Sequence, residues 1–385
     1  MRPPSIKSIL LQLHSIAGLT LSLFLAMIAL SGAMLSFEDE ILAALNADRT
    51  RVEVRATPRL QPDELIARLQ AATGAGKIAS ITLARDTASA VHIRFVRNDD
   101  TSRPSSVYVD PHDARVLGHP VGEGFFATVR KLHRWLLLPG DAKGWGRPIG
   151  GIVALGLIAM LITGLVLRWP HRAGSAKVWL KPNLRLRGRG LHRSLHAVIG
   201  TWAMLIYLVM VLTGLWWSFD WYRDGAMWLL SSAPARAEPM RPSPKRMAQS
   251  GELPLDRVWS AFLQQQGDRF VTARLTLPAG GTLVRVRSWT NPDADGVRDE
   301  LRIDALSGRI VSADLYAAKP LGDRILARVL DIHRGNILGL PGKLLFMLAA
   351  LAMPLFVVTG LLLYLSRRRH KRLSQRPLGE LVAGK

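Results

Sequence analysis

Leu13-His14-Ser15-Ile16-Ala17-Gly18 begins the stretch that decides the fold, and it returns in the second half as Leu195-His196-Ala197-Val198-Ile199-Gly200. The two copies are 182 residues apart, and the same offset relates Leu30-Ser31-Gly32 to Leu212-Thr213-Gly214. In each copy a histidine begins an apolar, membrane-length helix, and a glycine follows eighteen residues later. Eighteen residues are five helical turns, so this histidine and this glycine share one helix face, ~27 Å apart. A histidine within a membrane segment is by default a functional-site hypothesis.

The apolar composition predicts a membrane protein. The chain has 385 residues, of which 49% are hydrophobic. Four apolar segments are long enough to cross a bilayer, which takes ~20 residues for ~30 Å of hydrocarbon. We predict transmembrane helices over residues 8–37, 148–168, 194–219 and 343–366. The first also resembles a signal peptide, but its apolar run is longer than that of a signal and has a copy at 194–219, so we expect it to be retained.

The charge distribution predicts the topology. The formal net charge is +22, and many basic residues lie in two segments beside the predicted helix ends, 169–193 and 367–385. Because positive residues favour the cytoplasmic side, we expect both termini and the segment 169–193 to be cytoplasmic. We therefore attribute the basic charge to topology and lipid attraction, and not to nucleic-acid binding.

The chain contains no cysteine. This excludes disulfides, iron–sulfur clusters, thiolate-bound haem and covalent attachment of haem through a CxxCH motif. Any metal site has to use histidine, methionine or carboxylate ligands.

The two long segments on the other side of the membrane, 38–123 and 220–320, each predict a small α+β module. A linker is predicted over 231–254, and amphipathic helix-and-loop segments over 124–147 and 321–342 bring His133 and His333 to the following membrane helix. The predicted module helices are 62–69 and 254–266, and the predicted strands are 78–84, 91–96, 106–109, 115–118, 271–277, 282–289, 299–303 and 309–311. The predicted fold class is a polytopic α-helical membrane protein, with four transmembrane helices that arose by tandem duplication and two α+β modules.

The repeat sorts the histidines into two pairs. His14 and His196 are equivalent and lie in the cytoplasmic half of the membrane by the predicted topology. His133 and His333 are also equivalent, because Leu132-His133-Arg134 corresponds to Ile332-His333-Arg334. Two neutral imidazoles opposed across an apolar bundle suit a bis-histidine haem b. A single interfacial histidine is more often a polar residue at the headgroups, and a zinc site would need three or four ligands.

The remaining histidines rank lower. His192 lies one turn before His196 on the same helix face, and it stays an alternative ligand. We expect His171 and His370 to be solvated in basic tails, and His92, His112 and His119 to lie on the surface of the first module.

Each predicted span also carries a Ser/Thr-Gly pair. Gly32 and Gly214 lie at the depth of His133 and His333, and Gly164 and Gly360 lie at the depth of His14 and His196. Glycine lets a flat macrocycle approach the helix backbone, so we predict that these four residues pack against haem. Small residues of this kind also serve plain helix packing.

Nucleotide cofactors are not predicted. Gly74-Ala75-Gly76-Lys77-Ile78-Ala79 fits a dinucleotide-binding pattern, but it follows a helix and precedes a strand, which is the reverse of the required context. If the protein is a reductase, its electrons have to come from another donor.

Taken together, the repeated LH-x3-G and [ST]-G spans, the helix-plus-strand modules and the His-Arg before the even-numbered spans resemble the PepSY-associated transmembrane family. Within that family the chain is similar to bacterial siderophore reductases of the ferrioxamine-reductase type. The resemblance implies a bacterial inner-membrane protein with PepSY-like modules in the periplasm and two b-type haems. These would carry electrons from an unidentified cytoplasmic or membrane donor to a periplasmic ferric siderophore, with Arg134, Arg334 and Arg193 as candidate partners of the haem propionates.

Two other functions stay open at the level of sequence. PepSY modules also occur as regulatory or sensory domains, for which the spans would be anchors without redox activity. A haem or siderophore transport component is the third alternative, although four spans leave little room for alternating access.

Overall fold

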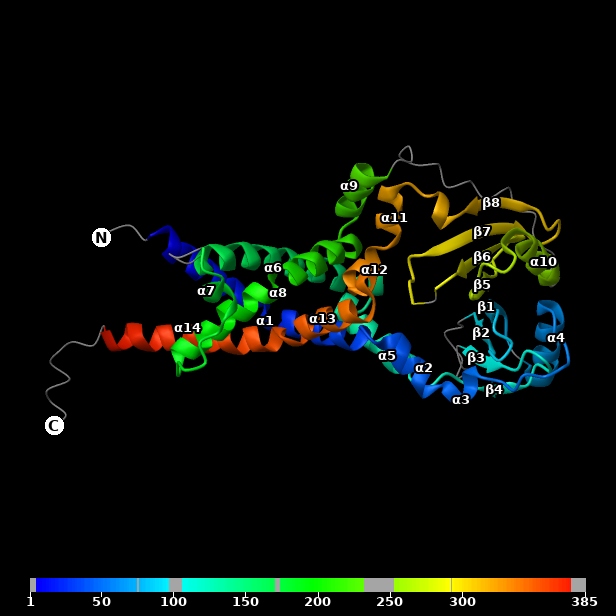
Figure 1. Cartoon of the computed structure of the whole chain (residues 1–385), viewed down its shortest axis with the longest axis horizontal. Helices are drawn as coiled ribbons and strands as arrows, with labels where there is room; N and C mark the ends of the chain where they lie inside the picture. The colour runs from blue at the N-terminus through cyan, green and yellow to red at the C-terminus, as the bar shows by residue number, and fades with distance from the viewer. Residues whose placement is uncertain are drawn as a thin grey trace. The chain divides into compact units, whose positions relative to one another are not determined.

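The computed structural model describes residues 5–74, 76–96, 106–169, 174–231, 253–291 and 293–374. Of residues 371–374 it describes the backbone alone. The chain divides into two compact units (Figure 1). Met1–Phe37, Phe126–Asp224 and Ile332–Lys385 form the helical unit, and Glu38–Phe125 and Gly225–Asp331 form the sheet unit.

The helical unit is built on four stretches that are long and apolar enough to cross a membrane, which confirms the predicted number of spans. They are α1 (Ile6–Leu35), α6 (Gly146–Arg168), α8 (Arg189–Ser218) and the stretch Asn336–His370. The last stretch is formed by η3 (Asn336–Leu338), α13 (Gly339–Leu351) and most of α14 (Met353–Ser374). Both α1 and α8 pack against α6 and against α13 and α14, so the helices alternate around the bundle.

The fourth span is interrupted at Ala352, between α13 and α14. Pro354 explains the break, because proline has no N–H to donate to the preceding turn and its ring crowds the carbonyl four residues earlier. The Ala352 N–H still bonds the carbonyls of Leu348 and Ala349, at 3.0 and 3.1 Å, which closes α13 before the chain turns into α14.

Short helices lie in the segments that connect the spans to one another and to the sheet unit. The segments 124–147 and 321–342 do contain the predicted amphipathic helices, but the second one is not continuous as expected. It divides into α11 and α12 at Arg328, where the backbone of Gly296 packs against Ala327 and Arg328. The bounds are α2 (Glu38–Leu45), α3 (Ala47–Thr50), α5 (Glu123–Trp135), η1 (Asp141–Lys143), α7 (Ala176–Leu180), α9 (Asp220–Leu230), η2 (Tyr316–Ala318), α11 (Leu321–Ala327) and α12 (Val329–His333).

The sheet unit contains one eight-stranded antiparallel sheet with the order β4-β3-β2-β1-β5-β6-β7-β8. The strands lie where the alternating sequence pattern predicted them. Their bounds are β1 (Ile78–Ala84), β2 (Val91–Phe95), β3 (Ser106–Val109), β4 (Val116–Gly118), β5 (Thr272–Thr276), β6 (Leu283–Trp289), β7 (Arg298–Asp304) and β8 (Ile310–Asp314). β1 pairs with β5, from Ser80 opposite Thr276 to Ala84 opposite Thr272. The two predicted modules therefore share one sheet.

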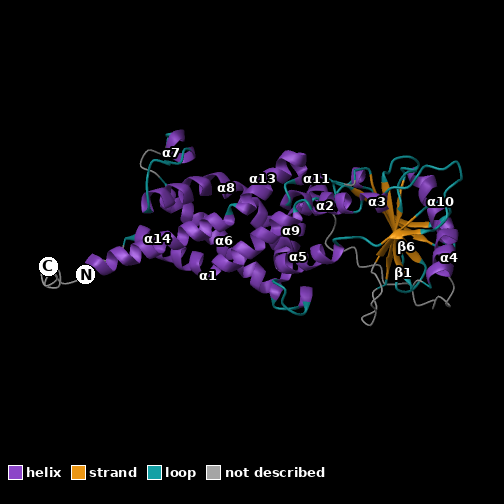
Figure 2. Ribbon diagram, turned by 90° about the horizontal axis from the view of Figure 1, so that it is seen from below, coloured by secondary structure: helices purple, strands orange, loops and turns teal. Residues whose placement is uncertain are grey.

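One face of this sheet is covered by α4 (Pro62–Thr73) and α10 (Leu255–Gln266) (Figure 2). Leu65, Leu69 and Phe262 of these helices are fully buried against strand residues such as Ile81 and Ile93. Burial of these apolar side chains is the main stabilising contribution to the unit. The segment 231–254, predicted as a linker, lies mostly outside the described residues.

Candidate functional site

The first histidine pair lies inside the helical unit. His14 of α1 and His196 of α8 face each other with their ring centroids 6.3 Å apart and their planes at 77°. The helices that carry them are separated around the bundle by α6 and α14. The structure thus brings together two residues that the sequence repeat paired across 182 positions, from 14 to 196.

The second pair lies at the other end of the spans. His133 at the end of α5 and His333 at the end of α12 have ring centroids 6.2 Å apart and planes at 63°. The ring of Trp217 packs edge-on against His333, with centroids 5.5 Å apart. Within each of the two pairs predicted from the sequence, the two imidazole rings therefore lie close together.

All four histidines are held in the same way, through Nδ1. His14 bonds the Thr163 hydroxyl at 2.9 Å, His196 bonds the Thr359 hydroxyl at 2.8 Å, and His333 bonds the Thr213 hydroxyl at 2.9 Å. His133 lies 3.3 Å from the Ser31 hydroxyl and 2.8 Å from the carbonyl of Ile28. Each of the four hydroxyl partners belongs to one of the four Ser/Thr-Gly pairs. A hydrogen bond at one ring nitrogen fixes the tautomer and leaves the other nitrogen for a metal.

The other ring nitrogen, Nε2, is free of protein hydrogen bonds at all four histidines within the described part of the chain. The same part contains no cluster of three or more His, Asp or Glu side chains that could hold a metal ion. Each pair of imidazoles could therefore supply at most two protein ligands to a metal ion or to a metal-containing cofactor.

The spacing of each pair agrees with a shared metal ion. An imidazole nitrogen bonds a metal at ~2.0 Å and lies ~1.1 Å from its own ring centroid, so two imidazoles on opposite sides of one metal ion would have centroids ~6.2 Å apart. The observed 6.3 and 6.2 Å match this value. Burial also lowers the pKa of His333 to about 3, which keeps its imidazole in the neutral, metal-binding form at neutral pH.

The glycines of the four pairs lie against these imidazoles. An added Cβ at Gly32 would come within 2.9 Å of His133 Cε1, and one at Gly164 within 3.3 Å of His14 Cε1. The corresponding distances are 3.5 Å from Gly214 to His333 and 3.7 Å from Gly360 to His196. The glycines thus give the histidine rings room beside the helix. Their predicted packing against a macrocycle stays a prediction.

The two pairs are well separated along the bundle. Thr213 follows His196 by seventeen residues of α8, and Ser31 follows His14 by the same number in α1. At 1.5 Å per residue this separation is roughly 25 Å. Aromatic side chains lie between the pairs: Phe356 contacts His196 with ring centroids 5.4 Å apart, and Tyr207 contacts Phe356 at 6.0 Å.

Arginines accompany the second pair. The positive charges of Arg134 and Arg334, two of the predicted propionate partners, contribute to lowering the pKa of His133 after burial, which is the main cause. Arg130 belongs to the same group, since its pKa is lowered by burial and then by Arg334 and Arg134. The sequence analysis missed Arg130, although it lies one turn before Arg134 on the amphipathic α5. Arg193, the third predicted partner, is exposed, and its charge acts on Arg168.

The other histidines do not join either pair. His192, the alternative ligand, lies on α8 but His196 is the residue opposite His14. His370 and His119 are exposed, as predicted, and His171 lies outside the described residues. His92 and His112 are half-buried, so they are less exposed than predicted. His92 stacks on Tyr108 with centroids 4.8 Å apart, and both ring nitrogens of His112 are enclosed.

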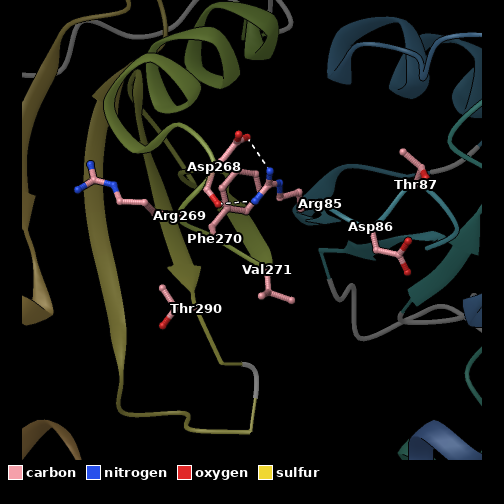
Figure 3. A pocket seen from close by; sticks show the side chains of 8 residues that line it. All are labelled: Arg85, Asp86, Thr87, Asp268, Arg269, Phe270, Val271 and Thr290. Atoms are coloured by element: carbon pink, nitrogen blue, oxygen red, sulfur yellow. Dashed lines mark hydrogen bonds and ion pairs between the residues drawn. The ribbon is translucent and has the colours of Figure 1, made fainter.

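A shallow pocket in the sheet unit has no paired histidines like those of the helical unit (Figure 3). It lies at the ends of β1 and β5, and Arg85 crosses it to pair with the Asp268 carboxylate at 3.0 Å. No histidine lines it. The lining residues are Arg85, Asp86, Thr87, Asp268, Arg269, Phe270, Val271 and Thr290.

Four spans, a paired-histidine bundle and an α+β sheet unit define the class as a multi-pass membrane protein. Residues 11–367 match the family described as the PepSY-associated TM region, and the chain belongs to this family. No curated protein sequence is significantly similar to the chain.

Proposed function

We propose that the protein is a di-haem b electron-transfer protein of the bacterial inner membrane, which reduces Fe(III)-siderophore to Fe(II) at the periplasmic face. The observation that carries the proposal is the pair of matched sites. At each site the ring centroids of two imidazoles lie 6.3 or 6.2 Å apart, at which distance both could bind one metal ion, and each ring is oriented through Nδ1 by a hydroxyl of a neighbouring helix.

His14 and His196 would hold one haem, and His133 and His333 the other. Bound haem supplies one-electron chemistry, because its iron alternates between the ferric and ferrous states. The chain orients the imidazoles through Nδ1, encloses the sites between apolar spans, and places Arg130, Arg134 and Arg334 beside the second pair as candidate propionate partners.

The direction of transfer follows from the predicted topology. Basic segments put the first pair near the cytoplasm and the second near the periplasm. An electron from a cytoplasmic or membrane donor would enter at the first site and leave at the second. There it reduces the siderophore-bound Fe(III) to Fe(II), which hard oxygen ligands hold less tightly. We also infer that the two halves arose by tandem duplication. The paired histidines His14 and His133 of the first half, with their hydroxyl partners and glycines, correspond to His196 and His333 of the second.

The test combines spectroscopy with turnover. Purified protein should show b-type haem bands in a dithionite-reduced minus oxidised spectrum, and the reduced protein should be reoxidised by ferric siderophore with release of Fe(II) to a ferrous chelator. Protein without haem bands would contradict the proposal. Protein with haem that ferric siderophore does not reoxidise would limit the proposal to electron transfer.

The alternative functions predict different results. A regulatory or sensory protein with plain anchors would bind no haem, and substitution of the four histidines would leave its signalling unchanged. A siderophore or haem transport component would move its cargo across the membrane without changing its oxidation state.

A further inference from the structure

The sheet unit has a second face, opposite to α4 and α10, and this face is rich in arginine. Alternate residues of the strands point away from the helix-covered core, as the burial pattern of β5, β6 and β7 shows. We call this surface the arginine face. Its arginines are Arg94 of β2, Arg274 of β5, Arg285 and Arg287 of β6, and Arg298 and Arg302 of β7.

The strand register places like charges opposite one another. Arg274 is directly opposite Arg287, and Arg285 is directly opposite Arg302. Like charges at directly opposed positions of a sheet are destabilising. Repulsion between these opposed arginines therefore destabilises the sheet at the centre of this face.

Carboxylates offset only part of this charge. Glu300 pairs with Arg287 at 2.7 Å and lies 3.7 Å from Arg302, and Glu123 lies 3.4 Å from Arg94. Arg298 has Asp295 at 3.9 Å.

Arg274 and Arg285 have no carboxylate within 4.0 Å in the described part of the chain. Arg274 instead bonds the Thr82 hydroxyl and lies over the ring of Trp289, 5.5 Å from its centroid. The Nε of Arg285 is enclosed and lacks a hydrogen-bond partner among the described residues. Burial, followed by the charges of neighbouring arginines, lowers the pKa of both guanidinium groups, so an anion beside them would be stabilising.

The face is accessible and partly aromatic. The side chains of Arg287 and Arg298 are 30% and 34% exposed, so their guanidinium groups can be reached from solvent. The stacked pair of His92 and Tyr108 provides half-buried flat rings between the charges, and the ring of Trp289 beside Arg274 is buried. Burial lowers the pKa of His92 to about 4, so this ring adds no charge at neutral pH.

We propose that the arginine face binds a multiply charged anionic metal chelate with aromatic or carboxylate oxygen ligands, of the tricatecholate class. Guanidinium groups bind paired oxygens in a fork and stack on aromatic rings, which matches both parts of such a ligand. A membrane surface is the less suitable occupant, because interfacial binding uses apolar side chains that insert between lipids, and the arginines here alternate with a buried core. The assignment of this ligand as the iron substrate rests on the proposed reductase function, whereas the binding itself does not.

The experiment measures binding of a redox-inert ligand to the full-length protein. Gallium(III) tricatecholate is titrated by calorimetry into protein held in nanodiscs of zwitterionic lipid, and an uncharged gallium(III) trihydroxamate serves as the comparison ligand. The test variant is Arg274→Gln/Arg285→Gln. The control is Arg68→Gln, which changes an exposed arginine on α4 that pairs with Glu64.

We expect the tricatecholate to bind at least tenfold more tightly than the trihydroxamate, and its affinity to fall at least tenfold in the double variant and with added salt. The control should bind like the unchanged protein. The double variant should unfold at an unchanged or higher temperature, because it removes opposed charges.

Equal affinity for the two chelates, or tricatecholate affinity that is unchanged in the double variant, would overturn the proposal. Competition by nanodiscs of anionic lipid, strong enough to abolish chelate binding, would show a lipid surface as the occupant and overturn it as well. Haem content is measured on the same samples, so loss of haem with retained binding would count against the reductase function and not against this site.

Discussion

At the scale of single residues, each Ser/Thr-Gly pair serves one histidine in two ways. In the pair Thr359-Gly360, the hydroxyl bonds Nδ1 of His196 and the glycine leaves space for Cε1 of the same ring. The sequence predicted which histidines lie together, and its assignment of the glycines to a macrocycle stays a prediction. Only the coordinates show that an imidazole lies there, because the orientation of a ring does not follow from residue spacing.

The glycine distances predict a graded response to alanine. At Gly32 the new methyl would be 2.9 Å from His133, so the ring or the helix has to move, whereas at Gly360 the distance of 3.7 Å is ordinary contact. We expect Gly32→Ala to lose haem from the second site and Gly360→Ala to retain both haems. Quantitative haem analysis of the purified variants measures this. Equal haem content in the two variants would show that the histidine positions are wrong.

The hydroxyl of Thr359 should strengthen the binding of haem iron by His196. Thr359→Val keeps the shape of the side chain but removes the hydrogen bond to Nδ1 of His196. Loss of such an orienting partner typically weakens metal binding 10–100-fold, so we expect haem at the first site to dissociate roughly tenfold faster or more. Haem transfer to an acceptor protein gives the rate. Thr201→Val is the matched control, because its hydroxyl bonds only the carbonyl of Ala197 in its own helix. A rate for Thr359→Val equal to that of the control would refute the orienting role.

At the scale of elements, the N-termini of α4 and α10 cap each other. The Asp63 carboxylate accepts hydrogen bonds from the backbone N–H groups of Leu255 and Asp256, at 2.8 and 3.1 Å. In return, the Asp256 carboxylate accepts one from the N–H of Asp63 at 2.8 Å. Helix N-termini need such acceptors. This reciprocal cap joins the helices of the two modules on the same side of the shared sheet.

Removal of one cap should loosen both helices. We expect Asp63→Ala to reduce the opening free energy of α10 by about 1–2 kcal/mol, because two of its N–H groups lose their acceptor. Hydrogen exchange of peptides that cover Leu255 and Asp256 measures this directly. Glu64→Ala, which removes only the exposed pair with Arg68, should change exchange little. Unchanged protection in Asp63→Ala would show that the cap is not a structural link.

The elements themselves were largely predictable, and their partners were not. The strands of both modules follow from alternating sequence, as in Val91, Ile93 and Phe95. The pairing of β1 with β5 could not be predicted, because the sequence of an edge strand does not specify which other strand it pairs with. Likewise the split between α11 and α12 depends on the close approach of Gly296, which is a tertiary contact.

At the scale of the whole molecule, the helical unit holds two similar sites at two depths. The sequence repeat predicted which histidines pair, since equivalent positions 14 and 196, and 133 and 333, proved to be neighbours. If both pairs hold haem as proposed, two sites roughly 25 Å apart along the helices would divide a membrane crossing of ~30 Å into shorter electron transfers. A protein that used its spans only as anchors would need neither pair.

The haem stoichiometry of the full chain and of its histidine variants tests this account most directly. The account predicts two b-type haems per chain in the unchanged protein, and one in each of His14→Ala, His196→Ala, His133→Ala and His333→Ala. A first-site variant combined with a second-site variant should bind none, and His370→Ala, at an exposed histidine, should keep both. Two haems in all four single variants, or none in the unchanged protein, would contradict it.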